Sequence, residues 1–385
     1  MRVKPFAALR PPKNLVEQVA SPPYDVLDSA EALAIAGDKS LLHITKPEID
    51  FSPMLPDNDP KVYRKAIDNF AEWQKKGYLV RDSKPCYYVY AQTMGERTQY
   101  GFVLCAHCDD YAKGLIKKHE LTRKDKEDDR MVHVNIQSAN IEPVFFAFRT
   151  QRELEDILYK TASSEPEYDF TDENGFGHKF WVISDDALIE RITELFSDRV
   201  DAFYIADGHH RSAAAARVGE ERAAANPSHR GDEEYNYFMA VCFPDDQLKV
   251  MDYNRVVKDL NGLVPSQIIG MLGEHFDIMC QGESVYAPSE LHTFSMYLEG
   301  KWYELKARPD TYHGADLVES LDVSILSKYV LDEILGIKDL RRDPRIDFVG
   351  GIRGLGELKR RVDSGEMKIA FALYPVTMEQ IEDIS

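Results

Sequence analysis

The chain has 385 residues, of which 44% are hydrophobic and 29% are charged, a composition typical of a globular protein with a buried core. Its 47 basic and 66 acidic residues give a net charge of −19, which disfavours general binding to nucleic acid or to anionic membranes. The five cysteines are scattered and predict no disulfide framework, and no long uncharged apolar run is present, so we expect a cytoplasmic protein.

The N-terminal part of the chain combines a shaped loop with a helix. Prolines punctuate the first 30 residues, and Pro22-Pro23 forces an extended backbone just before Tyr24-Asp25. From residue 61 to residue 76, apolar side chains recur at helical spacing, and Gly77 follows them. This pattern predicts an amphipathic helix that ends at a glycine.

The rest of the chain alternates strands and helices. Runs at 86–93 and 98–107, separated by a turn that contains Gly95, predict a hairpin. We further predict strands at 143–148, 179–184, 202–206, 237–243 and 368–374, and helices at 152–161, 187–196 and 212–225. The predicted fold class is therefore mixed α/β (α+β).

The most distinctive feature is Asp207-Gly208-His209-His210-Arg211, between a predicted strand and an alanine-rich helix. A strand, a tight turn and a helix aim backbone amides at an anion, and a helix begins with roughly half a positive charge. Gly208 permits the turn, and the histidines and Arg211 add donors toward a phosphate. Asp207 is expected to hold Mg²⁺ or to cap the helix. The plainer alternative is a capping residue followed by two surface histidines.

A second charged cluster begins with His119-Glu120-Leu121-Thr122-Arg123 and continues to Arg130. In a helix, Glu120 and Arg123 share one face, where Glu120 and His119 could serve as an acid/base pair. A salt-bridged, solvent-exposed helix produces the same pattern. The arginine at 123 excludes an HExxH zinc motif, so we do not expect a metalloprotease.

Three weaker features have plain structural explanations. Cys105 and Cys108 form a CxxC at a strand end, without a second pair, so we do not expect zinc there. Tyr253 and Arg255 are candidate substrate contacts, and the glycine-rich stretch 350–356 is a candidate ligand loop; a strand end and an ordinary loop explain them equally well. No motif of P-loop enzymes, Rossmann dehydrogenases or α/β-hydrolases occurs in a plausible setting.

Four motifs together resemble the successive signatures of domain-of-unknown-function family 1015. They are Pro22-Pro23-Tyr24-Asp25-Val26, His119-Glu120-Leu121-Thr122, Asp207-Gly208-His209-His210-Arg211 and Tyr253-Asn254-Arg255-Val256-Val257. The third is also similar to the nucleotide-binding turn of the ParB/sulfiredoxin superfamily, which includes a free-serine kinase that uses ADP as phosphoryl donor. The resemblance implies a ParB/sulfiredoxin-like nucleotide-binding core at 131–260 with additional α/β elaborations, between α/β regions at 1–130 and 261–385.

The resemblance also implies roles for individual residues. Gly208, His209, His210 and Arg211 would touch the phosphates of a nucleotide, and Asp207 would position them or hold Mg²⁺. We expect Glu120, His119 and Asp207 to act in catalysis; Glu120 is expected to be the base from its position beside His119 and Arg123, not from the resemblance. The residues expected to contact the substrate are Tyr24, Asp25, Arg123, Tyr253 and Arg255.

These roles predict a small-molecule phosphotransferase or phosphohydrolase that acts on serine or phosphoserine, with ATP or ADP as donor. The main alternative is a non-catalytic nucleotide-binding switch or regulatory protein. A third possibility is an interaction protein whose motifs only build the fold. We expect no nucleic-acid partner and no membrane association.

Overall fold

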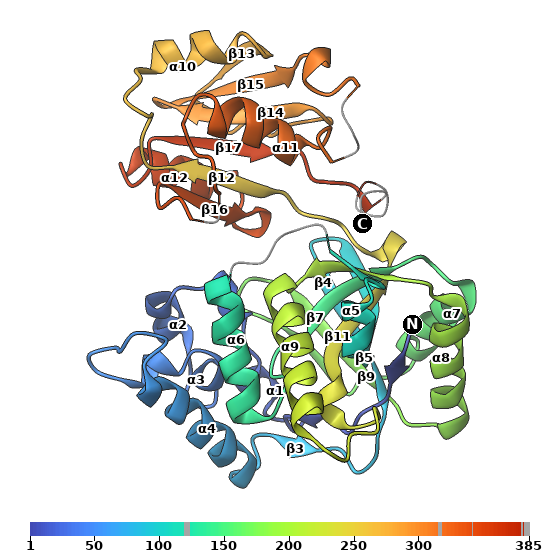
Figure 1. Ribbon diagram of the computed structural model, residues 1–385. Coiled ribbons are helices and arrows are strands. Elements are labelled where there is room, and N and C mark those ends of the chain that lie inside the picture. The colour runs from blue at the N-terminus through green and yellow to red at the C-terminus, as the bar shows by residue number, and fades with distance from the viewer. Residues whose placement is uncertain (119–123, 315–317, 341, 379, 381–385) are drawn as a thin grey trace. The chain divides into compact units, whose positions relative to one another are not determined.

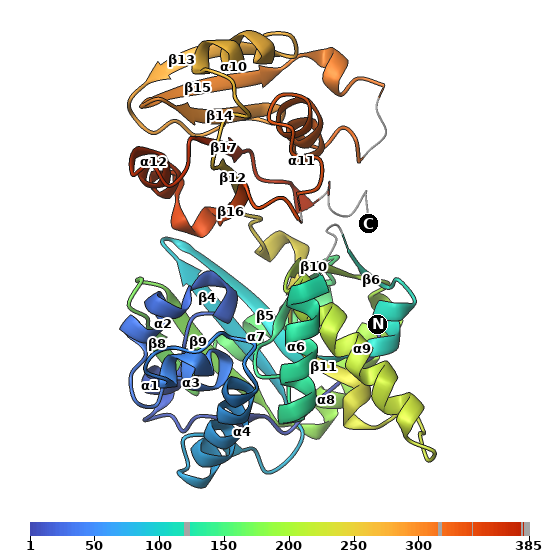
Figure 2. The ribbon, with the colours of Figure 1, turned by 60° about the vertical axis from the view of Figure 1, so that its left-hand side comes forward.

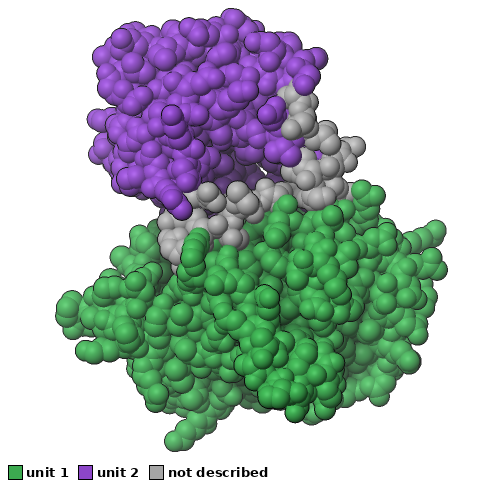
Figure 3. Space-filling view, viewed as in Figure 1, with its two compact units in different colours: residues 1–248, 385 green, residues 249–384 purple. Residues whose placement is uncertain are grey.

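The computed structural model describes residues 1–118, 124–314, 318–340, 342–378 and 380, and the chain divides into two compact units. Unit 1 comprises residues 1–248 and unit 2 residues 249–384 (Figure 3). The sequence suggests three regions that meet near residues 130 and 260. In the structure, strands from the first two of these regions pair within one sheet, because β4 (Tyr87–Met94) pairs with β9 (Gly177–Ile183).

Unit 1 is built on a nine-stranded mixed sheet of order β6-β10-β7-β11-β5-β4-β9-β8, with β1 paired to β5 (Figure 1). Its other strands are β1 (Val3–Lys4), β5 (Arg97–His107), β6 (Ile116–Lys117), β7 (Val144–Phe148), β8 (Tyr168–Thr171), β10 (Phe203–Asp207) and β11 (Tyr237–Pro244). The pairs β6–β10 and β7–β11 are parallel, and the others are antiparallel. A separate ribbon joins β2 (Leu9–Arg10) to β3 (Val80–Arg81).

Alternating apolar residues give this sheet two buried faces. On one face, Phe102, Phe146 and Phe203 pack with side chains from the helices α7 (Arg152–Ala162) and α8 (Asp186–Arg199). On the other face, Tyr88, Val103, Val241 and Phe243 pack with the N-terminal segment around Phe6 and Ala8. The large sheet is therefore covered by helices on one side and partly by the N-terminal segment on the other.

The remaining helices of unit 1 lie beside the sheet. They are α1 (Val16–Val19), α2 (Ser29–Ile35), α3 (Leu42–Thr45), α4 (Pro60–Lys75), α5 (Cys108–Ala112), α6 (Lys124–Gln137) and α9 (His209–Ala225). Helices α6 and α9 pack side by side, with Met131 buried against Ala214 and Val218, and α4 contacts α6 (Figure 2). This packing brings the start of α9 close to segments that are far away in the sequence.

Unit 2 contains a six-stranded antiparallel sheet of order β13-β15-β14-β17-β12-β16. Its strands are β12 (Tyr253–Val257), β13 (Phe276–Gly282), β14 (Thr293–Leu298), β15 (Lys301–Ala307), β16 (Ile346–Gly350) and β17 (Ile369–Leu373). Helices α10 (Pro265–Leu272) and α11 (Asp322–Leu326) pack on one face, and α12 (Leu355–Asp363) places Leu358 on the other. Among the described residues, no helix combines the length and the apolar character needed to cross a membrane.

The elements predicted from periodicity are confirmed. The predicted helix at 61–76 is α4, capped by the Asp59 side chain and followed by Gly77 with φ of 73°. The predicted hairpin is β4–β5, in which Met94 pairs with Arg97 across Gly95. One prediction is wrong by a turn: α9 begins at His209, not at residue 212, because Gly208 starts the helix immediately after the strand.

Candidate functional site

The start of α9 follows β10 directly through a left-handed glycine. Gly208 has φ of 92° and ψ of 37°, a conformation that residues with a Cβ rarely adopt. A Cβ at this position would also lie 3.0 Å from Cγ1 of Val144 and 3.2 Å from Nε of Arg211. The backbone conformation therefore favours glycine strongly here, and a Cβ would also push against Val144 and Arg211.

Asp207 does not cap the helix. It is the last residue of β10, where the register with β7 shifts between Ile205 and Asp207. The capping position is held by Gly208, which has no side chain to bond the first amides of α9. The positive end of the helix dipole thus meets the end of the strand, and the expectation that Asp207 is a capping residue is wrong.

Arg211, in the first turn of α9, holds the site together. Its Nη1 donates to the carbonyl oxygen of Pro143 at 2.6 Å, and its Nη2 donates to Oδ2 of Asp207 at 2.6 Å. The same Nη2 lies 3.7 Å from Oδ2 of Asp25. Burial opposes the charge of Arg211, whose side chain is 10% exposed, but Asp207 and Asp25 more than compensate and raise its pKa. One guanidinium therefore joins three segments that are distant in sequence.

Glu142 is a third carboxylate beside Arg211, at the residue before Pro143. Its Oε1 accepts a hydrogen bond from the backbone N–H of Tyr24 at 2.8 Å. Burial raises the pKa of Glu142 to about 7; the charge of Arg211 opposes this shift and that of Asp25 adds to it. Burial also raises the pKa of Asp25, whose side chain is 41% exposed; the charge of Arg211 opposes this shift, and the charge of Asp207 adds to it. Carboxyls with raised pKa values gather at functional sites.

Arg130 of α6 places a second guanidinium at this site. Its Cζ lies 3.8 Å from the centre of the Tyr24 ring, in cation–π geometry, and its Nε donates to Asp129 at 2.9 Å. Asp129 also accepts a hydrogen bond from the hydroxyl of Tyr63 at 2.8 Å. This chain of contacts fixes the Tyr24-Asp25 segment against α6.

A small cavity of about 40 Å³ lies among these residues. Arg130, Glu142 and Arg211 contribute to its polar lining, together with His133 and Gln137 of α6. Burial, followed by the charge of Arg130, lowers the pKa of His133 to about 4, so its imidazole is neutral at pH 7. The volume suits one small polar group and is far below the 300–1,000 Å³ typical of a site that encloses a drug-sized ligand.

The structure brings together only part of the predicted site. Tyr24 and Asp25 meet the turn at 207–211, in which His209 is buried and His210 is partly exposed. His119, Glu120 and Arg123 lie outside the described residues. Tyr253 and Arg255 belong to unit 2 and are described there by themselves.

In unit 2, Tyr253 and Arg255 form an aromatic and cationic patch with Phe348. The Tyr253 ring stacks on Phe348 at 5.3 Å between centroids, and Cζ of Arg255 lies 4.5 Å from the centre of the Phe348 ring. Tyr253 is 47% exposed, whereas Arg255 is buried. These contacts join neighbouring strands β12 and β16, so they have a structural role in unit 2.

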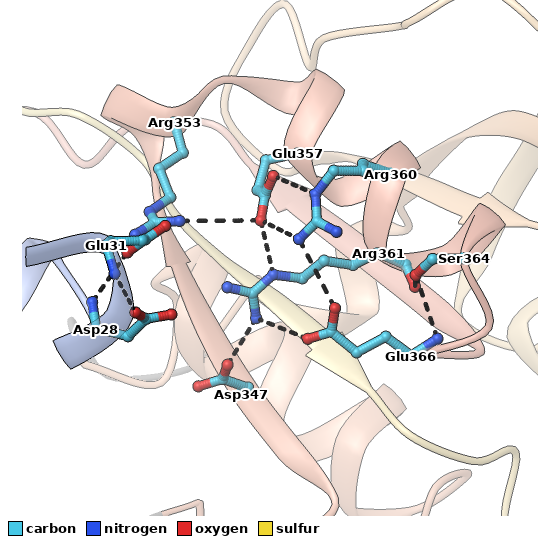
Figure 4. Close-up of polar contacts among 9 residues, drawn as sticks. All are labelled: Asp28, Glu31, Asp347, Arg353, Glu357, Arg360, Arg361, Ser364 and Glu366. Atoms are coloured by element: carbon cyan, nitrogen blue, oxygen red, sulfur yellow. Dashed lines mark hydrogen bonds and ion pairs between the residues drawn. The ribbon is translucent and has the colours of Figure 1, made fainter. Parts of the chain in front are cut away.

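The glycine-rich stretch 350–356 packs closely and leads into a charge-balanced helix. A Cβ on Gly351 would overlap Asp252, so close packing explains this glycine. Around α12, Glu357 binds Arg360 at 2.8 Å and Arg361 at 2.9 Å, and Arg361 also reaches Asp347 at 2.7 Å (Figure 4). These ion pairs join α12 to β16.

Mg²⁺ was predicted at Asp207, and the site can be tested for its fit to that ion. Among the described residues, no group of three or more His, Cys, Asp or Glu side chains could enclose a metal. Mg²⁺ that arrives with a nucleotide needs only one or two carboxylates, because phosphates and water supply the other ligands. Asp207, 59% exposed, and Asp25 both reach the same guanidinium, so these two residues fit that limited role.

Two members of the cluster, Glu142 and Arg130, were not singled out from the sequence. Glu142 is an isolated acid before a proline and a buried strand, and Arg130 closes a charged run. A glutamate and a proline before a fully apolar strand are the local signal that could have drawn attention to Glu142. The cavity beside it is lined by residues of α6 and, from segments far away in the sequence, of α3, α9 and β11.

The fold and the site define a mixed α/β protein in which a strand, a glycine turn and a helix meet a partly buried cluster of arginines and carboxylates. The chain belongs to the DUF1015 family, described as proteins of unknown function, whose model matches residues 3–324. No curated protein matches the chain.

Solved structures give distant similarities. A conserved hypothetical protein from Pyrococcus furiosus is 15% identical, with 73% of this chain and 83% of that chain covered and a TM-score of 0.34. A free serine kinase variant in complex with ADP (TM-score 0.35) and free serine kinase in complex with AMP (TM-score 0.33) are also each 15% identical. Both matches cover 73% of this chain and 80% of the other chain. We assign no residue of the site from these similarities.

Proposed function

We propose that the protein is a nucleotide-dependent phosphotransferase or phosphohydrolase that acts on serine or phosphoserine, built on a ParB/sulfiredoxin-like core. The main support is the position of Arg211, which is held at the start of α9 between Asp207, Asp25 and the carbonyl of Pro143. A fixed guanidinium and a helix N-terminus are both groups that bind phosphate in proteins.

In this proposal, the nucleotide phosphates lie at residues 207–211 and displace part of the carboxylate contacts of Arg211. Gly208 supports this placement, because its left-handed conformation lets α9 begin directly after β10, and the N-terminus of a helix binds anions. Catalysis of phosphoryl transfer depends mainly on positioning and on neutralising charge, and Arg211 and the helix dipole supply both.

Mg²⁺ bound by Asp207 and Asp25 would neutralise phosphate charge when the nucleotide is present. These carboxylates would otherwise repel the phosphates that Arg211 attracts. Arg211 in turn holds the two carboxylates near the same guanidinium nitrogen.

The choice of serine or phosphoserine follows from the resemblance of the turn at 207–211 to the superfamily that includes free-serine kinase. The small cavity next to Glu142 suits a small acceptor. Water in place of an alcohol would make the same site a phosphatase.

The test is phosphate exchange by the full chain: serine with ATP or ADP, and phosphoserine alone, each with Mg²⁺. The proposal predicts turnover that Asp207→Asn abolishes. Asp169→Asn is the matched control, because Asp169 is 56% exposed and also pairs with a cation, Lys179, but lies away from the site. Nucleotide binding without turnover would favour a non-catalytic switch, and the absence of both binding and turnover would refute the proposal.

A further inference from the structure

Glu142 is held in one orientation with one oxygen available. Its Oε1 accepts the Tyr24 N–H, whereas within the described part of the chain Oε2 makes no hydrogen bond. Pro143, directly after it, is fixed through its carbonyl by Arg211. The carboxylate is therefore anchored through Oε1, the backbone after it is held by Arg211, and Glu142 lines the cavity.

The surroundings of Glu142 suit a group that exchanges a proton near neutral pH. Its pKa of about 7 leaves a substantial ionised fraction at pH 7 and makes the ionised form more basic than an ordinary carboxylate. The charged or titratable groups that face it come from three segments: Tyr24 and Asp25, Arg130 of α6, and Arg211 of α9. The neutral His133 completes the cavity lining without adding charge.

The cavity limits what can approach Glu142. Its volume of about 40 Å³ admits a group the size of a hydroxymethyl or a carboxylate but not a nucleoside. Arg211 spans the distance between this cavity and the turn at 207–211, because one of its nitrogens binds Pro143 and the other binds Asp207. A small acceptor and the phosphates of a nucleotide would therefore be neighbours on either side of Arg211.

We infer that Glu142 is the proton acceptor for a small primary alcohol whose hydroxymethyl group enters this cavity, an inference that rests on the proposed phosphotransfer. The alcohol oxygen forms a bond to the terminal phosphorus of a nucleoside di- or triphosphate as the bond from that phosphorus to the bridging oxygen breaks. The electron pair of the broken bond stays with the departing nucleotide, and the hydroxyl proton moves to Oε2 of Glu142. This assigns to Glu142 the role that the sequence suggests for Glu120.

The experiment measures phosphoryl transfer to serine by the full chain from pH 5 to 9. We expect the wild-type kcat to rise with pH through an apparent pKa near 7, and Glu142→Gln to lower kcat by about 100- to 10,000-fold without that rise. Nucleotide affinity, measured by calorimetry, should change less than about threefold. Glu167→Gln, which alters a glutamate beside Arg10 elsewhere in unit 1, is the matched control and should retain the wild-type profile.

A second variant separates chemistry from structure. Glu142→Ala vacates the carboxylate position, and added formate should restore part of the activity, which a merely structural role would not allow. If the wild type turns over and Glu142→Gln has the same rate and the same pH profile, the inference is wrong and the proposed function stands. Absence of wild-type transfer to any small alcohol would overturn both.

Discussion

Replacing Gly208 by alanine tests the geometry of the turn directly. A residue with a Cβ at φ of 92° costs about 1–2 kcal/mol of stability. The new methyl would lie 3.0 Å from Val144 and 3.2 Å from Arg211, and relieving such overlap typically costs a further 1–3 kcal/mol or so. We therefore expect Gly208→Ala to lower the free energy of unfolding of unit 1 by about 2–5 kcal/mol.

Two further glycine variants divide this value into its causes. Gly95→Ala has a positive φ of 60° with no atom within 4 Å of the new Cβ, so it should show only the conformational cost of about 1–2 kcal/mol. Gly37→Ala has neither a positive φ nor a close neighbour and should be neutral or slightly stabilising. The difference between Gly208→Ala and Gly95→Ala measures the packing against Val144 and Arg211.

The assay must report on unit 1 alone, because two units need not unfold together. Hydrogen exchange followed by mass spectrometry in increasing urea gives a local free energy of opening for peptides from β7 and β10. A Gly208→Ala value equal to that of Gly95→Ala would refute the close packing. A value equal to that of Gly37→Ala would refute the left-handed conformation itself.

Three further predictions concern the charged cluster. Arg211→Lys cannot reach Pro143 and Asp207 together, so we expect at least tenfold weaker nucleotide binding by calorimetry; unchanged affinity would contradict the role of the guanidinium fork. Glu142→Gln should stabilise unit 1 at pH 8 by up to about 3 kcal/mol. Because the pKa of Glu142 is raised in the folded state, the wild-type protein loses stability as pH rises from about 4 to about 7. The stabilisation by Glu142→Gln should therefore vanish at pH 4. His133 has the opposite effect on the pH dependence of stability: because its pKa is lowered to about 4, stability falls as pH drops from about 6.5 to 4. His133→Gln should flatten this part of the profile of melting temperature against pH. An unchanged profile in the variant would show that other groups cause the slope.

The sequence by itself determined the local elements and the most distinctive motif. Helix α4 was readable because Val62, Ala66 and Trp73 repeat at helical spacing and are buried together, and the β4–β5 hairpin was readable around Gly95. The turn at 207–211 was recognisable because its residues are contiguous. Periodicity and turn chemistry are properties of neighbouring residues, so they are visible in a linear chain.

The tertiary structure alone decided which side chains meet and in what charge state. Pairing of β7 with β10 sets Pro143 and Glu142 beside Asp207, and packing of α6 against α9 adds Arg130. The left-handed Gly208 made Asp207 a strand end instead of a helix cap. A pKa depends on burial and on charges within a few ångströms, and segments far apart in the sequence supply both for Glu142. That environment exists only once the sheet and the helices have brought those segments together.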